Sequence, residues 1–335
     1  MTELFDKVRG GFYGQALGDS WAMPAWLNPQ QTWDYYGGYI EEFRDAPDTH
    51  PVHHGLRAGQ VTDDTEQAAA IAEVIIRDGK VTAEGVAQAL VAWYHRIGGD
   101  ASPYVGPSSR RAIQAIQRGE DLNQVGRHGD TNGAGMRVSP IGLIHPGDVE
   151  GAIRDAAISC IPTHNTDVAV SGAAAVAGAI AAALKPASTL DEVVEAGVYA
   201  AGQGRKYGHV WIGASVPKRI RLAVEIARSG KPVRERLQDL YDIVGATLAI
   251  SEAVPAAFGV LVMAEGDPVR CGVLAAALSG DADTVAAMAC AVAGAWKGIA
   301  AFKPEYLALM QKANPWLDFD AVTSGLYELA LKQVK

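Results

Sequence analysis

Two acidic stretches, one near each end of the chain, carry the residue types best suited to chemistry. They are Thr62–Glu66 (TDDTE) and Asp281–Thr284 (DADT). Each places at least two carboxylates and at least one hydroxyl within about one helical turn, directly before a run of small apolar residues that is typical of a buried helix. Such oxygens, without nearby Cys or paired His, are ligands for a hard divalent ion such as Mg²⁺ or Mn²⁺. The two stretches could therefore form a two-metal centre if the fold brings them together.

Helix capping explains the same residues without any chemistry. Asp and Thr are common N-cap residues, Asp63 and Glu66 have the spacing of a capping box, and the helix dipole favours acids in a first turn. However, a cap uses one side-chain oxygen, and adjacent carboxylates repel each other unless a cation lies between them. The surplus of oxygens favours a cation site.

The acidic stretches belong to a longer series of motifs. In chain order the series comprises Gly14–Asp19 with Pro24, Gly59–Thr65, Gly106–Arg110, Asn132–Arg137, Thr163–His164, Glu252–Ala256 and Gly280–Thr284. In this order the motifs resemble those of the ADP-ribosylglycohydrolase family, from about residue 10 to residue 300. The resemblance implies a compact multi-helix orthogonal bundle. It also implies a hydrolase that cleaves the C1 glycosidic bond of an ADP-ribosyl or related ribosyl substrate, either a small molecule or an ADP-ribosylated protein.

The resemblance further implies roles for individual residues. Two Mg²⁺ or Mn²⁺ ions would be held by Thr62, Asp63, Asp64, Asp281, Asp283 and Thr284. The catalytic carboxylates would be Asp63, Asp64 and Asp283, with Asp130 as a further proton acceptor, and the substrate contacts would be Asp19, Trp26, Asn132, Gly133 and His164. Two ions could hold a ribose diol and a bridging water, and position that water for attack on an oxocarbenium-like centre.

For three of these residues, the side chain or the local sequence suggests a role independently of the resemblance. The small residues around Asn132 and Gly133 let backbone amides approach a phosphate or a sugar hydroxyl closely. His164, which precedes an Ala-rich helix, could orient a substrate or a water, although a structural hydrogen bond explains it equally well.

Trp26 departs from the family pattern, which often has a glutamate at this point of the motif. An indole ring can stack on a base but cannot transfer a proton or bind a metal. This departure favours a small nucleoside-like or ribosyl substrate, and Glu41 or Glu42 from the same loop could supply the missing carboxylate. Three hypotheses remain open: an ADP-ribosyl glycohydrolase, a nucleosidase or other small-ribosyl N-glycosidase, and a non-catalytic binding or structural protein.

The elements that must position these residues are predicted to be helices. Gly10, Gly14 and Gly18 share one face of a helix from about residue 3 to 20, which indicates very close approach by another helix at the centre of the fold. Residues 65–78 and 82–96 have helical spacing, and no clear period-2 strand is found. We therefore predict an all-α fold with a central Gly-rich helix. Residues 19–59 are predicted to be a long, irregular, aromatic-rich loop.

Composition limits the class of protein. The chain has 335 residues without a linker-like segment, so one domain spanning residues 1–335 is expected. Its 49% apolar and 7% aromatic content predicts a core of small aliphatic residues, and a net charge of −9 argues against nucleic-acid binding. The three cysteines have neither disulfide nor zinc spacing, and the N-terminus lacks the features of a signal peptide. The apolar run from Val168 to Leu184 is short and Ala-rich, so we expect a buried helix of a cytoplasmic protein and no membrane partner.

Overall fold

The computed structural model describes residues 2–333 of the chain. It has eighteen α-helices within that range and no β-sheet, only the isolated bridges Thr131–Ala249 and Thr166–His209. The all-α prediction is confirmed. The single-domain assignment of residues 1–335 stays a prediction.

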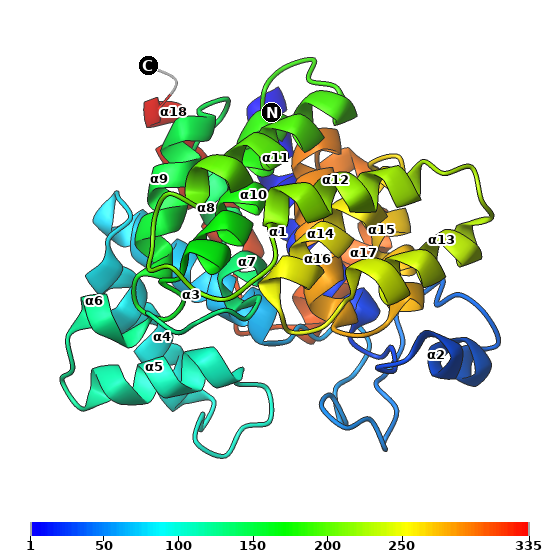
Figure 1. The fold of residues 1–335 in the computed structure, drawn as a ribbon, viewed down its shortest axis with the longest axis horizontal. Coiled ribbons are helices and arrows are strands. Elements are labelled where there is room, and N and C mark those ends of the chain that lie inside the picture. The colour runs from blue at the N-terminus through cyan, green and yellow to red at the C-terminus, as the bar shows by residue number, and fades with distance from the viewer. Residues whose placement is uncertain (1, 334–335) are drawn as a thin grey trace.

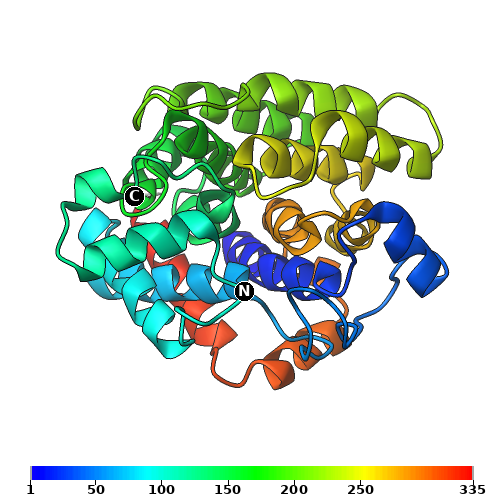
Figure 2. The ribbon, with the colours of Figure 1, turned by 60° about the horizontal axis from the view of Figure 1, so that its bottom comes forward.

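The central pair of helices is α1 (Glu3–Ala22) and α16 (Ala282–Lys297). Figure 2 shows α1, in blue, in the middle of the molecule with other helices around it. A Cβ atom added to Gly10, Gly14 or Gly18 would lie 2.3 Å from a carbonyl oxygen of α16. The Gly stripe therefore makes the close helix contact that its spacing predicts.

Gly14→Ala should lower the free energy of unfolding by about 1–3 kcal/mol, because the added methyl group forces the two central helices apart. This loss should exceed the gain of roughly 1 kcal/mol that Ala normally has over Gly in a helix. Gly202→Ala, in α11 (Leu190–Gly204), is the matched control, since nothing lies within 4 Å of its added Cβ atom. Denaturant unfolding followed by circular dichroism measures both. Equal midpoints for the two variants would contradict the close contact.

The remaining helices surround this pair (Figure 1). The Ala-rich α10 (Asp167–Ala183) contacts both α9 (Val149–Cys160) and α11. Further contacting pairs are α12 (Val216–Ala227) with α14 (Ile250–Met263), α15 (Pro268–Leu278) with α16, α3 (Asp63–Asp78) with α4 (Ala83–Arg96), and α18 (Phe319–Gln333) with α1. The other elements are α2 (Pro29–Tyr36), α5 (Pro107–Gln117), α6 (Leu122–Val125), α7 (Gly133–Met136), α8 (Ser139–Leu143), α13 (Val233–Asp239), a π-turn (Leu240–Val244), a 3₁₀ turn (Ile299–Ala301) and α17 (Pro304–Ala313).

The apolar run from Val168 to Leu184 forms α10, in which every residue but Ala182 is buried. No helix between residues 2 and 333 combines the length and apolarity needed to cross a membrane. The cytoplasmic location stays a prediction from composition.

One helix was not predicted within the loop of residues 19–59. Asn28 accepts hydrogen bonds from two backbone amides at the start of α2, Pro29 occupies its first turn, and Gly37 ends it in the left-handed conformation. These are ordinary start and stop signals. The high aromatic content of the segment obscured them.

Candidate active site

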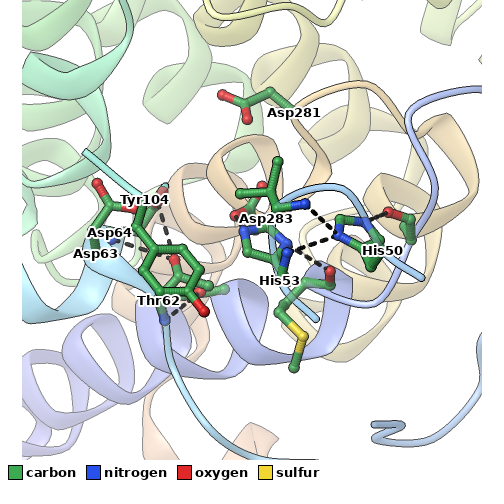
Figure 3. Close-up of polar contacts among 12 residues, drawn as sticks. His50, His53, Thr62, Asp63, Asp64, Tyr104, Asp281 and Asp283 are labelled. Carbon is green, nitrogen blue, oxygen red and sulfur yellow. Dashed lines mark hydrogen bonds and ion pairs between the residues drawn. The ribbon is translucent and has the colours of Figure 1, made fainter. Parts of the chain in front are cut away.

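A cavity of about 190 Å³ brings the two acidic stretches together. Asp63 and Asp64 reach it from the first turn of α3, and Asp283 reaches it from the first turn of α16. Figure 3 shows these carboxylates with the rings of His53 and Tyr104, and Asp281 at the edge of the group. The predicted site residues that line the cavity are Asp63, Asp64, Asn132, Gly133, Asp281, Asp283 and Thr284.

Asp19 holds the start of α3 in place. Its carboxylate accepts hydrogen bonds from the backbone N–H of Thr62 (3.0 Å) and from both the N–H (3.2 Å) and the hydroxyl (2.6 Å) of Thr65. Asp19 has no exposed surface and does not line the cavity. It therefore positions the start of α3, which carries the metal-ligand candidates of the first acidic stretch. Direct substrate contact by Asp19 stays a prediction.

The cap of α3 differs from the predicted capping box. Thr62 is the N-cap, and its hydroxyl lies 3.3 Å from Asp64 Oδ2, to which it donates. Glu66 accepts a hydrogen bond from the Trp93 indole instead of bonding back to the cap. The capping-box interpretation of Asp63 and Glu66 is wrong, because the N-cap lies one residue earlier, at Thr62, and the Glu66 carboxylate is held by Trp93.

The start of α16 is set by a tight turn. Gly280 has a φ of +72°, and a Cβ atom there would lie 2.2 Å from the carbonyl oxygen of Ala246. The same oxygen accepts a hydrogen bond from Asp281 N at 2.7 Å, and the Asn132 amide donates to the Asp281 carboxylate. Asn132 therefore joins the fourth predicted motif, Asn132–Arg137, to the second acidic stretch.

Burial and mutual repulsion raise the pKa values of most of these acids. The pKa values of Asp63 and Asp64 lie well above the usual range because both groups are buried and because Asp283 lies near them. Burial, followed by the charge of Asp283, raises the pKa of Asp281 to about 7. Closely spaced carboxylates of this kind favour a bound cation.

His53 is the one imidazole in direct contact with these acids within residues 2–333. Its Nδ1 donates to the Met23 carbonyl oxygen at 2.9 Å, and its Nε2 lies 3.1 Å from Asp283 Oδ2. Burial alone would lower the pKa of His53, but the contact with Asp283 raises it to about 9. Burial alone would raise the pKa of Asp283, and the His53 imidazolium lowers it below its usual range. His53 was not among the site residues predicted from the sequence, because its contact with Asp283 joins segments that are far apart in the chain.

Parallel rings form one wall of the cavity. His50 and His53 stack with centroids 5.0 Å apart and planes 11° apart, and Tyr104 lies parallel to His53 with centroids 6.0 Å apart. Trp26 packs against His50 at 5.5 Å and does not line the cavity. Trp26 therefore lies behind the ring of His50, outside the cavity lining. Direct stacking of Trp26 on a substrate stays a prediction.

The loop that carries Tyr104 is fixed by Arg110. The guanidinium donates to the carbonyl oxygens of Gly99, Asp100 and Ser102, each at 2.7 Å. Arg110 therefore fastens the loop through backbone carbonyl oxygens on the N-terminal side of Tyr104.

Asp130 and His164 also lie outside the cavity lining. The Asp130 carboxylate accepts a hydrogen bond from the Trp211 indole at 3.1 Å. His164 is fully buried beneath Gly133, where a Cβ atom would lie 2.9 Å from its ring. Their catalytic and substrate-binding roles stay predictions, and His164 acts as a structural hydrogen-bonding residue in this structure.

The donor set fits a hard divalent cation in type and charge. Asp64 Oδ1 is buried without a hydrogen-bond partner, and no Lys or Arg of the described range lines the cavity. A buried, unpartnered carboxylate oxygen is destabilising unless a cation or a water binds it. In residues 2–333, however, no group of three or more His, Cys, Asp or Glu side chains has the arrangement of a complete metal site.

Comparison with known proteins gives the family. The ADP-ribosylglycohydrolase family profile matches residues 1–334. The chain is 34% identical over 323 residues to the uncharacterised protein YegU of Escherichia coli K12, covering 96% of both chains. It is 24% identical over 315 residues to the ADP-ribosylarginine hydrolase Tri1 of Pseudomonas putida GB-1, covering 91% of this chain and 74% of the relative. A solved structure, described as an ADP-ribosylglycohydrolase-related protein complex, has the same fold with a TM-score of 0.73 at 22% identity, covering 98% of this chain and all of the other. The chain therefore belongs to the ADP-ribosylglycohydrolase family and is a hydrolase of the glycosylase type.

Proposed function

We propose that this chain is a divalent-cation-dependent glycohydrolase that cleaves the C1 glycosidic bond of an ADP-ribosyl or related ribosyl substrate. One observation carries the proposal. The acidic starts of α3 and α16, which are far apart in the sequence, line one cavity that no Lys or Arg among the described residues neutralises. A site built this way has an excess of negative charge, and its acidic residues supply the oxygen donors that a hard divalent cation prefers.

The ions in this proposal are Mg²⁺ or Mn²⁺, with Thr62, Asp63, Asp64, Asp281, Asp283 and Thr284 as the ligand candidates. Bound there, they would lower the pKa of a coordinated water and polarise ribose oxygens.

The protein groups have separate tasks. Asn132 and His53 each hold a carboxylate, Asp281 and Asp283 respectively, and so fix the orientation of the second acidic stretch. The negative charge of the cluster stabilises the positive charge that develops at C1 of the ribose in the transition state. Met23 and Tyr104 line the cavity and limit the entry of bulk water.

The substrate class rests on three observations. The similarity to Tri1, which is described as an ADP-ribosylarginine hydrolase, favours an ADP-ribosyl substrate, free or protein-linked. The alternative, a nucleosidase or small-ribosyl N-glycosidase, is favoured by the cavity of about 190 Å³, which is below the ~300–1,000 Å³ common for drug-sized ligands. The ring wall of His50, His53 and Tyr104 is also suited to stacking on a base.

Incubation of the metal-free protein with ADP-ribosyl-arginine, O-acetyl-ADP-ribose and a panel of nucleosides tests the proposal. We expect release of ADP-ribose, or of ribose from a nucleoside, only after Mg²⁺ or Mn²⁺ is added, because a bound cation would offset the repulsion among the acids and lower the pKa of a bound water. Product release measured by chromatography separates the two substrate classes. Full turnover in the presence of excess chelator would contradict the metal-dependent mechanism.

A further inference from the structure

A buried guanidinium lies behind the acidic cavity without a carboxylate partner. Arg137 is 1% exposed, and it takes part in none of the ion pairs found within residues 2–333. It donates instead to two neutral oxygens, Gln67 Oε1 at 2.9 Å and Thr163 Oγ1 at 2.5 Å. A guanidinium has only donors, so both partners must accept.

The first branch runs from Arg137 to a metal-ligand candidate. Because Gln67 Oε1 accepts from Arg137, the amide nitrogen of Gln67 points the other way and donates to Asp63 Oδ2 at 2.9 Å. Gln67 has no exposed surface, so no solvent competes for either end of its amide. Arg137 therefore sets which end of Gln67 meets Asp63.

The second branch runs from Arg137 to Thr131, which also lines the cavity. Thr163 Oγ1 lies 2.7 Å from His164 Nδ1, and His164 Nε2 lies 2.9 Å from Thr131 Oγ1. Thr163 and His164 have no exposed surface. If Nδ1 carried the imidazole hydrogen, Thr163 would accept twice and its own hydroxyl hydrogen would have no partner in the described range, which is unfavourable when buried. The arrangement without an orphaned donor has Thr163 donating to Nδ1, so Nε2–H donates to Thr131.

We infer that Arg137 is a positioning residue that fixes the direction of the hydrogen bonds at two residues of the cavity lining, Asp63 and Thr131, and leaves the Thr131 hydroxyl as a donor to the bound substrate. Thr131 lines the cavity, and its oxygen already accepts from His164. No other hydrogen-bond partner of this hydroxyl lies within residues 2–333. Its hydrogen is therefore available to an acceptor atom of the substrate. The identity of that substrate rests on the function proposed above, whereas the direction of the network does not.

Nitrogen-15 NMR of the metal-free protein tests the network without any substrate. With the His164 ring assigned through its backbone connectivity, we expect a neutral imidazole that is protonated at Nε2. A ring protonated at Nδ1, or a doubly protonated ring, would overturn the inference. This result does not depend on turnover, so it remains decisive even if the proposed function fails.

Kinetics then test the consequence for the substrate identified in the panel. Thr131→Val should raise KM about tenfold with a smaller change in kcat, since one hydrogen bond to the substrate is lost. Thr131→Ser, which keeps the hydroxyl, should restore KM towards the original value. If Thr131→Val and Thr131→Ser have the same KM, Thr131 donates no hydrogen bond to the substrate, and the inference fails.

Arg137→Met should reproduce the KM effect of Thr131→Val, and Arg137→Lys should recover part of it.

Should Arg137→Met not fold, Thr163→Val breaks the same branch and leaves the guanidinium in place. Its matched control is Thr323→Val in α18, a fully buried threonine whose hydroxyl donates to the Phe319 carbonyl oxygen. We expect Thr163→Val to raise KM several-fold and Thr323→Val to leave it unchanged. Equal KM values for Thr163→Val and Thr323→Val would show that this branch has no effect on substrate binding, and the inference would fail.

Discussion

Replacing Asp283 with Asn should lower kcat/KM by about a thousandfold on the substrate that the panel identifies. Asp283 lies in the first turn of α16, lines the cavity and contributes to the raised pKa values of Asp63, Asp64 and Asp281. Asn keeps the shape of the side chain but removes the charge that would hold a cation and stabilise an oxocarbenium-like centre. Activity assays give the loss of turnover, and calorimetric titration with Mg²⁺ or Mn²⁺ gives the expected loss of affinity.

The control for Asp283→Asn is the same substitution at an exposed site. Asp242 lies in the π-turn, where its carboxylate accepts a hydrogen bond from Gln238. Asp242→Asn should leave kcat/KM and metal affinity unchanged, and both variants should keep the helical circular dichroism spectrum. A protein that keeps its turnover after Asp283→Asn would remove this carboxylate from the mechanism. Loss of turnover with unchanged metal affinity would leave it a catalytic role but no role as a ligand.

The parts of the fold that were predictable depend on local sequence patterns. The Gly stripe of α1 predicts its close contact because three residues spaced by four lie on one helix face. The acidic stretches were found because each directly precedes an apolar run with helical spacing. In the structure these stretches form the first turns of α3 and α16. Both patterns can be recognised without knowing which distant segments meet.

The parts that were missed depend on contacts between segments far apart in the chain. His53 lies in an irregular loop, and only the fold places its ring against Asp283. The same holds for the hydrogen bonds that Asp19 accepts from the backbone amides at the start of α3. The packing of the Trp26 ring against His50 likewise depends on the fold, and the family motif that contains Trp26 does not reveal it. The close spacing of His50, His53 and His54 was a signal in the sequence, but spacing alone could not show which of them faces the acids.

Divalent cations should raise the melting temperature of the protein. At a hundredfold excess over Kd, binding to the folded state alone adds about 2.7 kcal/mol of stability, which corresponds to roughly 4 °C for a chain of this size. The physical reason is the repulsion among buried carboxylates, which raises the pKa values of Asp63 and Asp64 in the metal-free protein. Differential scanning calorimetry with chelator, Mg²⁺ or Mn²⁺ measures the shift.

Asp64→Asn should separate this repulsion from ordinary packing. Asp64 is 2% exposed, and its Oδ1 has no hydrogen-bond partner, so the neutral amide removes a buried charge without opening a cavity. We therefore expect the metal-free variant to melt a few degrees higher than the original protein, because a like charge is removed from the cluster. The same variant should lose most of the shift caused by Mg²⁺ or Mn²⁺.

Asp267→Asn is the control, because Asp267 caps α15 and Asn caps a helix equally well. Neither the melting temperature of this variant nor its response to metal should change. A lower metal-free melting temperature for Asp64→Asn would mean that the charge of Asp64 is compensated inside the protein, and the cavity would then need no cation to be stable.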